Sequence, residues 1–199
     1  MDYTKLLAIT SASLLLSACA TTGSPLIGGK VEYGDAKAVE TVTTDFGSTD
    51  LQVMAETMTR SMLQSPVITR ANDRPLVTIA DIKNKTSEYI DTRAITNTVR
   101  SQLLKSGSVR FATDIADMKS QTDELTRQSQ SGLYKKNTQA KIGKMEGAQY
   151  RMEGEITSIV KRSADMKDVY YKLSLILTNV EAGTVEWAEE KDIRKTAKR

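Results

Sequence analysis

The last third of the chain alternates apolar and polar residues over two long stretches, residues 150–160 and 169–180. The second stretch places Tyr171, Leu173, Leu175 and Leu177 at every other position. Because successive side chains of a strand point to opposite faces of its sheet, this period predicts strands with one buried face and one face in water. Residues 181–184 contain a glycine and predict a turn into a third strand, residues 185–188. We therefore expect an antiparallel meander joined by hairpins.

The middle of the chain carries apolar residues at helical spacing instead. A methionine-rich stripe predicts a helix from Thr49 to the Ser65-Pro66 dipeptide, where it has to stop. The stripe consists of Leu51, Met54, Ala55, Met58 and Met62. It is typical of a core face, although such a stripe can also form an adaptable binding face. Thr49 and Gln52 have the spacing of a capping box, which we expect at the start of this helix.

Residues 75–82 and 109–112 predict two buried strands on either side of a second helix. Asp91 is placed to cap that helix, and Lys105-Ser106-Gly107 marks its end. Strand, helix and strand in this order predict a right-handed parallel unit. Two polar helices are expected over residues 114–130 and 137–146. The sequence therefore predicts an α/β (α+β) fold, with a small mixed sheet of about four to five strands flanked by helices.

Composition excludes several classes of function. The 199 residues include no histidine and one cysteine, so Ser-His-Asp and Cys-His catalysis and the common zinc sites are excluded. We expect no metal and no cofactor. The 28 basic residues exceed the 25 acidic ones by only three, which is too weak a balance to predict nucleic-acid binding. The basic tail, residues 193–199, is expected to fray in solvent, with binding to a membrane surface or a phosphate as the alternative.

The single cysteine ends a signal-like segment. A largely apolar run of 11 residues, 6–16, is too short to span a bilayer but has the length of a signal-peptide core. It leads into Leu16-Ser17-Ala18-Cys19, which resembles the lipobox of bacterial lipoproteins. This resemblance implies that residues 1–18 are a signal peptide, and that Cys19 becomes the first residue and carries acyl chains such as palmitate. No aspartate follows Cys19, which by the known sorting pattern implies the outer membrane, facing the periplasm.

Residues 19–45 are rich in Thr, Gly and Ser and lack a helical or strand period, so they predict a flexible tether. Fully extended, such a tether reaches on the order of 90 Å. Residues 46–199 are then left as one globular domain.

Several stretches of this chain closely resemble the LpoB family. They are residues 31–35, 38–41, 45–52, 65–68 and 83–92, together with the closing Gly183-to-Trp187 hairpin. The resemblance implies a globular domain similar to the N-terminal domain of TolB. It also implies an outer-membrane lipoprotein that docks on a class A penicillin-binding protein, a bifunctional peptidoglycan synthase, and activates it. The family is not enzymatic, so no catalytic residue and no small-molecule substrate are implied.

Two other readings of the sequence stay open. The first is a structural or secretion-apparatus lipoprotein, since TolB-like domains also occur there. The second is an enzyme that uses a pair of carboxylates, for which Glu153 and Glu155 are candidates. Both lie on the strand face that also carries Arg151 and Thr157, which favours an ordinary solvated surface.

A docking surface is predicted on exposed loops, which often carry binding residues. The candidate residues are Asn84, Lys85, Thr86, Ser87, Glu88 and Tyr89, with Tyr134, Lys135 and Lys136 as neighbouring exposed groups. Tyrosine is enriched in binding hot spots. The alternative is that these are loop residues with no binding role.

Overall fold

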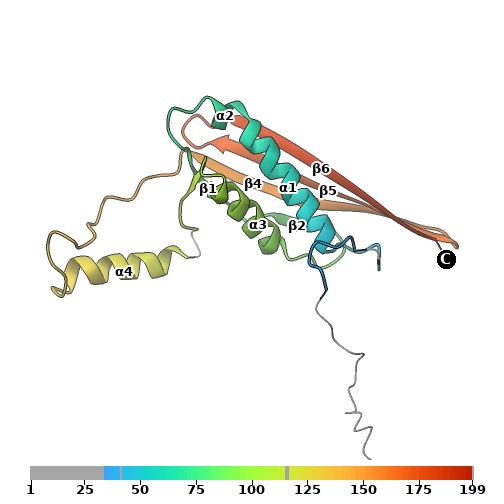
Figure 1. Cartoon of the computed structure of the whole chain (residues 1–199), viewed down its shortest axis with the longest axis horizontal. Helices are drawn as coiled ribbons and strands as arrows, with labels where there is room; N and C mark the ends of the chain where they lie inside the picture. The colour runs from blue at the N-terminus through green and yellow to red at the C-terminus, as the bar shows by residue number, and fades with distance from the viewer. Residues whose placement is uncertain (1–33, 41, 115–116, 199) are drawn as a thin grey trace, which may run out of the picture. The chain divides into compact units, whose positions relative to one another are not determined.

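The computed structural model describes residues 34–40, 42–114 and 117–198, and shows a mixed sheet with helices packed on one face (Figure 1). The strands are β1 (Leu76–Ile79), β2 (Lys83–Lys85), β3 (Arg110–Phe111), β4 (Tyr150–Arg162), β5 (Met166–Asn179) and β6 (Val185–Lys198). The helices are α1 (Ser48–Gln64), α2 (Pro66–Thr69), α3 (Thr92–Lys105) and α4 (Met118–Gln130). The predicted fold class is confirmed, with six strands in place of the expected four to five.

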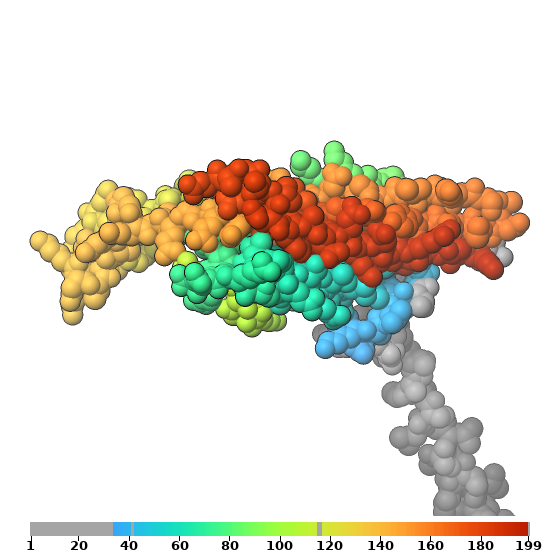
Figure 2. Space-filling view, turned by 90° about the horizontal axis from the view of Figure 1, so that it is seen from above, coloured from blue at the N-terminus to red at the C-terminus, as the bar shows by residue number. Residues whose placement is uncertain are grey.

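The sheet combines a short parallel part with a long antiparallel part. Its strand order is β3-β1-β4-β5-β6, and β2 pairs with β4 further along the same edge. β1 is parallel to both β3 and β4, which confirms the parallel strand–helix–strand unit. β4, β5 and β6 form the expected antiparallel meander and extend past α1, as both the ribbon and the space-filling view show (Figures 1 and 2).

The core lies between α1, α3 and the inner face of the sheet. Leu173, Leu175 and Leu177 are all at most 1% exposed, as the alternation predicted. In the methionine stripe of α1, Met54, Ala55, Met58 and Met62 are fully buried and Leu51 is partly buried, so the stripe is a core face and not a binding face. Gly154 of β4 lies against β5 so closely that a Cβ there would be 2.1 Å from the Ser174 carbonyl oxygen. The position therefore accepts only glycine.

The start of α1 differs from the predicted capping box. Its N-cap is Gly47, whose N–H donates to Asp50 Oδ2 at 2.9 Å. Glu40 Oε2 accepts from Ser48 N at 2.8 Å, so a carboxylate from the preceding segment satisfies a further N–H of the first turn. Thr49 and Gln52 instead bond to carbonyls of residues 38 and 36. At α3 the predicted cap is confirmed, with Asp91 accepting from two backbone N–H groups.

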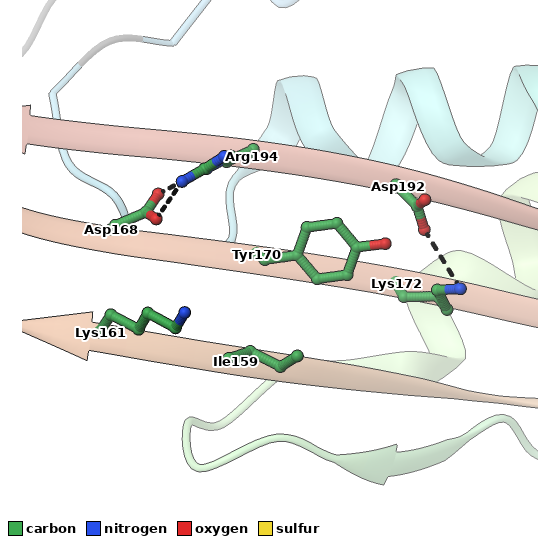
Figure 3. A pocket seen from close by; sticks show the side chains of 7 residues that line it. All are labelled: Ile159, Lys161, Asp168, Tyr170, Lys172, Asp192 and Arg194. Atoms are coloured by element: carbon green, nitrogen blue, oxygen red, sulfur yellow. Dashed lines mark hydrogen bonds and ion pairs between the residues drawn. The ribbon is translucent and has the colours of Figure 1, made fainter.

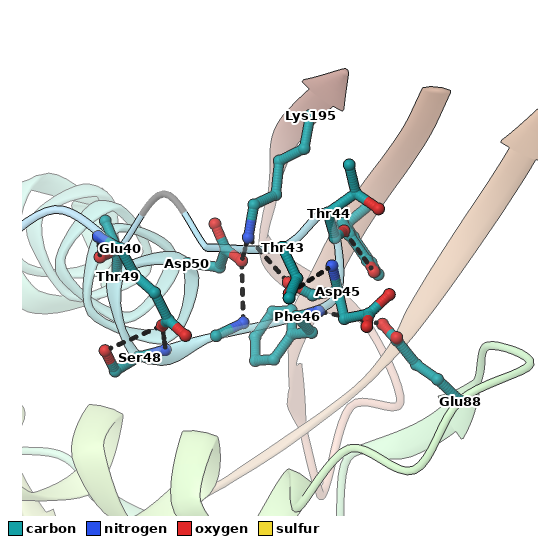
Figure 4. A network of polar contacts seen from close by, with 12 residues as sticks. Glu40, Thr43, Thr44, Asp45, Phe46, Ser48, Thr49, Asp50, Glu88 and Lys195 are labelled. Atoms are coloured by element: carbon teal, nitrogen blue, oxygen red, sulfur yellow. Dashed lines mark hydrogen bonds and ion pairs between the residues drawn. The ribbon is translucent and has the colours of Figure 1, made fainter. Parts of the chain in front are cut away.

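Residues 44–46, which we call the strap, cross the inner face of the sheet where it extends past α1 (Figure 4). Tyr171 donates its hydroxyl to Thr44 O at 3.1 Å, and the Phe46 ring meets the Tyr171 ring edge-on at 5.7 Å. Lys195 Nζ donates to Asp45 O and to Asp50 Oδ2, both at 2.7 Å. Thr44 and Asp45 of the strap belong to the segment predicted as tether, and these contacts bind the end of that segment to the domain.

Three further predictions of local structure are wrong in whole or in part. Residues 137–146 form turns and no helix. Gly143 has a positive φ of 78°, which is outside the helical region, and the expected apolar stripe has no surface to pack on, since Ile142 is 59% exposed. The tail does not fray: residues 193–198 belong to β6 and pair with β5 from Met166 to Tyr171. The loop expected at residues 83–89 begins with a strand, since Lys83–Lys85 pairs with β4. The strand expected at 109–112 is confirmed and is shorter, Arg110–Phe111.

Candidate partner-binding surface

Side-chain hydrogen bonds hold the loop after β2 in one shape. Asn84 Oδ1 accepts from the Thr86 backbone N–H at 2.9 Å and from Thr86 Oγ1 at 2.7 Å. Asn84 Nδ2 donates to Glu88 O at 2.9 Å and so closes the turn. An asparagine that bonds to the backbone two residues ahead is a common turn device. Such a loop loses less conformational entropy on binding than an unstructured one.

The predicted loop residues divide into an inward and an outward group. Glu88 turns inward: its Oε1 accepts from Phe46 N at 3.2 Å and its carboxylate lies beside the Tyr171 hydroxyl. Burial raises the pKa of Tyr171, and the Glu88 carboxylate raises it further. Tyr89 turns outward and is 92% exposed, and Lys85 and Ser87 are exposed as well. Glu88 thus fixes the loop to the strap, while Tyr89 is presented to solvent.

The second predicted group, Tyr134 to Lys136, belongs to a different part of the molecule. Arg127 of α4 lies over the Tyr134 ring, 5.3 Å from its centroid, so this tyrosine, which follows α4 in the chain, is half-buried against that helix. Lys135 and Lys136 are exposed. No hydrogen bond or ion pair between described residues joins this group to the loop after β2. The structure does not bring the two groups together.

A shallow hollow of about 640 Å³ lies on the outer face of the sheet, across β4, β5 and β6 (Figure 3). It is lined by Ile159, Lys161, Asp168, Tyr170, Lys172, Asp192 and Arg194. The strand register places Ile159, Tyr170 and Arg194 in one row across the three strands. An apolar side chain, an aromatic ring and a guanidinium therefore share one accessible row.

Ion pairs fix the charged groups around this hollow. Arg194 donates to both carboxylate oxygens of Asp168, at 2.9 and 2.6 Å, and these bonds lower the pKa of Asp168. Lys172 lies 2.7 Å from Glu190 and 3.8 Å from Asp192. The bond to Glu190 raises the pKa of Lys172, so the ammonium stays charged over the whole physiological range. The Tyr170 ring lies between the two clusters (Figure 3).

The sequence analysis missed this surface for an identifiable reason. Tyr170 and Lys172 occupy the polar positions of the β5 alternation, which predicts only that they face water. Their partners Asp192 and Arg194 lie in or next to the segment that was expected to fray. The one local signal was that Ile193 and Ala197 are apolar at odd positions, but charged residues at the other odd positions from 189 to 195 interrupt this pattern.

The loop and the hollow are parts of one continuous face. In the parallel register Lys83 is paired with Glu155 and Lys85 with Thr157, and paired residues of neighbouring strands point to the same side. Glu155 and Thr157 lie on the outer face, so both lysines do too. The outer face therefore runs from β2 and its loop to β6 and carries groups suited to binding, with no closed cavity.

The described residues offer little for chemistry. They contain no group of three or more Cys, Asp or Glu side chains placed to hold a metal ion. Glu153, one of the two carboxylates considered for catalysis, lies 3.3 Å from Arg151 in an ion pair. Glu155 is exposed on the open sheet face.

The proposed lipid-attachment residue, Cys19, lies outside the described residues. Within the described part of the chain, no helix is both long and apolar enough to cross a membrane.

A family model described as the peptidoglycan-synthase activator LpoB matches residues 50–193. This match covers well over half of the chain. The chain belongs to the LpoB family. The match spans the domain from α1 into β6 and includes the loop after β2 and most of the outer face. It confirms the resemblance found in the sequence and assigns the chain to a family of synthase activators. The comparison with curated proteins finds no match.

Solved structures of LpoB are among the chains similar to this one. The C-terminal domain of LpoB from Salmonella enterica is 18% identical, with a TM-score of 0.46, over 72% of this chain and 98% of that one. The same domain from Escherichia coli is 17% identical, with a TM-score of 0.46 and the same coverage. The NMR structure of E. coli LpoB is 14% identical, with a TM-score of 0.41, over 94% of this chain and 87% of that one.

Proposed function

We propose that this chain is an outer-membrane lipoprotein that binds and activates a class A penicillin-binding protein, with no catalytic step of its own. The match of residues 50–193 to the activator family is the observation that carries the proposal. The outer face supports it, because exposed loop and sheet side chains are held in place there by hydrogen bonds and ion pairs. Such a surface suits a protein partner better than a small substrate.

The anchor in this proposal is Cys19, acylated after removal of residues 1–18, with the domain facing the periplasm. The tether covers residues 19–45, and the globular domain residues 46–199. The described residues 36–40 and 42–45 already contact the domain, so in this proposal residues 19–34 are the part of the tether that spans the distance to the membrane. A fully extended chain of this length reaches about 55 Å. A synthase in the opposite membrane has to supply the remaining distance through its own height.

A binding protein can raise a synthase's rate only by preferring the active conformation of that synthase. The coupling free energy equals the difference between its affinities for the two states. A preference of about 1–3 kcal/mol corresponds to about 5- to 150-fold activation. Because no group of this chain has to reach the reacting atoms, the lack of a catalytic constellation among the described residues is compatible with this mechanism.

The docking residues in this proposal are Asn84 to Tyr89, with Tyr134, Lys135 and Lys136 as a second group. Tyr89 is the expected anchor, because a fully exposed tyrosine on a pre-shaped loop can enter a partner pocket at low entropic cost. Asn84 and Glu88 act indirectly, by holding the loop.

The proposal is tested by titrating the mature chain with Cys19→Ala into purified class A synthases of the same cell while measuring glycan polymerisation. We expect binding and a faster rate, and Tyr89→Ala should weaken binding at least tenfold, as for a hot-spot residue. Tyr134→Ala is the matched variant: a similar loss there would make the α4 segment the docking site. If no synthase binds or responds to the unmutated surface, the activator proposal is wrong.

The anchor is tested separately in cells. Cys19→Ala should abolish palmitate labelling and cellular function but leave stimulation of the purified synthase unchanged. Full complementation by this variant would show that the anchor is not needed.

A further inference from the structure

Charge is distributed unequally along the long sheet. The end formed by residues 159–168 and 193–198 contains six basic and two acidic residues. The opposite end, residues 150–153 and 176–190, contains five acidic residues and one basic one. The basic end exists because residues 193–198 continue β6 and pair with Met166 to Tyr171, which brings the two basic segments side by side.

At the basic end the outer face mixes cations with apolar groups. We call the following six residues the end patch: Ile159, Lys161, Met166, Tyr170, Arg194 and Lys198. They share this face because β4 contributes its odd positions and β5 and β6 their even positions. Ile159 is 59% exposed and Met166 is 41% exposed, because nothing in the described chain covers this part of the outer face.

Three of the six end-patch residues are cationic, and the neighbouring carboxylate of Asp168 neutralises only one of them, Arg194. Asp168 is bound by Arg194 and also accepts from Thr196 Oγ1 at 3.2 Å. Lys161 and Lys198 form no salt bridge with a described residue. The patch therefore has excess positive charge beside exposed apolar side chains and one tyrosine.

We propose that the end patch binds the surface of an anionic lipid bilayer. Basic side chains beside exposed apolar ones attract anionic headgroups and insert at the acyl boundary, and tyrosine prefers that boundary. The segment that leads towards Cys19 contacts the inner face of the same end of the sheet, where Asp45 bonds to Lys167 and Lys195. Because a short tether keeps the patch at high effective concentration near the membrane, weak intrinsic affinity is sufficient.

The inference rests on the proposed anchor at Cys19 and adds a second state to the proposed function. Lys83 and Lys85 lie on the same outer face as the end patch. A domain lying on a bilayer through this face has its β2 edge close to the lipid, so the bilayer and the synthase compete for it. The domain would then rest on the membrane until a synthase binds.

The test uses the mature chain with Cys19→Ala, so that no acyl chain contributes to binding. The protein is sedimented with vesicles of phosphatidylethanolamine and phosphatidylglycerol, and with vesicles of phosphatidylcholine alone, at low and raised salt. We expect binding to the anionic vesicles only, weakening as salt rises. Replacing both Lys161 and Lys198 by glutamine should weaken it about 10- to 30-fold.

The matched control replaces Lys141 and Lys144 by glutamine; both are exposed, and neither belongs to the end patch. This control has the same net charge as the Lys161/Lys198 variant and should bind almost as well as the parent protein. Thermal unfolding of both variants verifies that the fold is intact. Equal losses in the two variants would reduce the effect to net charge and overturn the proposal, as would no binding to anionic vesicles.

A third result also overturns it: no vesicle binding, but weaker synthase binding in the Lys161/Lys198 variant, would make the end patch a protein-docking surface. The vesicle assay contains no synthase, so its outcome is independent of the activator proposal. Failure of synthase stimulation with intact vesicle binding would remove the proposed function and leave the lipid-binding surface in place.

Discussion

The same three strands are stabilised in different ways at their two ends. Where α1 and α3 cover the sheet, Leu173, Leu175 and Leu177 are buried in an apolar core with Trp187. Past α1, the strap and a set of charged pairs take over, with Lys195 bonded to Asp50 and Arg194 to Asp168. The covered end is held chiefly by apolar packing, which pH and salt affect little, whereas the far end depends on groups that can titrate and be screened.

This difference separates stability from function. The apolar core at the covered end keeps the strands in register. At the far end, ion pairs hold the charged side chains of the exposed face in fixed positions. Substitutions in the core should therefore reduce global stability, while substitutions in the far end should change the strap and the outer face with smaller losses. The four variants below test this division, from the largest expected effect to the smallest.

Leu173→Ala should have the largest effect, a loss of about 2–5 kcal/mol in the free energy of unfolding, because it leaves a cavity in the fully buried core. Val160→Ala, at a 39% exposed position of the far end, is the matched control and should cost less than half as much. Urea denaturation followed by circular dichroism measures both. Equal losses would show that the two ends share one mode of stabilisation.

Asp50→Ala should cost about 1–3 kcal/mol, because it leaves the Gly47 N–H without its acceptor and the Lys195 ammonium with the Asp45 carbonyl but no carboxylate. The Asp50 side chain is 6% exposed and that of Lys195 is 16% exposed, so water replaces the lost partner only in part. Hydrogen exchange should speed up in residues 44–46 and the first turn of α1 more than in β5. Uniform acceleration over the whole domain would contradict a local role.

How far the sequence predicts this fold depends on where the deciding interactions lie. The meander, the helix with the methionine stripe and the Asp91 cap follow from local periods and local chemistry, and they were predicted correctly. The strand at residues 193–198 was not, because its register comes from β5 and its anchor, Asp50, lies 145 residues earlier. Residues 137–146 show the reverse case: a helical spacing of apolar residues had no surface to pack on.

The candidate surface was predicted only in part, for the same reason. Tyr89 is 92% exposed, and its exposure in a loop was expected from the polar residues around it. Glu88 was expected to face a partner, but its carboxylate accepts from the backbone of Phe46, 42 residues earlier, a contact that no local pattern contains. Tyr170 and Arg194 meet only through the pairing of β5 with β6.

Tyr171→Phe should cost about 0.5–1.5 kcal/mol near neutral pH, because it removes the hydrogen bond to Thr44 O from the buried far end. It should also change the alkaline limb. Burial raises the pKa of Tyr171 in the folded protein above its ordinary value of 10.0. The native protein is therefore stabilised below pH 10.0, and it loses this contribution as the pH rises from 10.0 towards the raised pKa of the folded state. Phenylalanine cannot ionise, so the stability difference between the two proteins should shrink above pH 10. A constant difference from neutral pH upward would contradict the buried neutral hydroxyl.

Arg194→Gln should have the smallest effect at neutral pH, because the guanidinium is largely exposed and surface ion pairs contribute little. This small effect should also depend on pH. In the native protein Arg194 lowers the pKa of Asp168 below its ordinary 3.8, so this carboxylate stabilises the fold above that pH and the contribution is lost as pH falls below it. The variant should show a higher pKa for Asp168 by NMR titration, and the stability difference between the two proteins should shrink as the pH falls below 3.8. Arg60→Gln, which breaks the solvent-exposed pair with Glu56 on α1, is the control and should leave the acid limb unchanged. If both variants shift the acid limb equally, the Asp168–Arg194 pair is an ordinary surface contact, and the far end is stabilised by the strap alone.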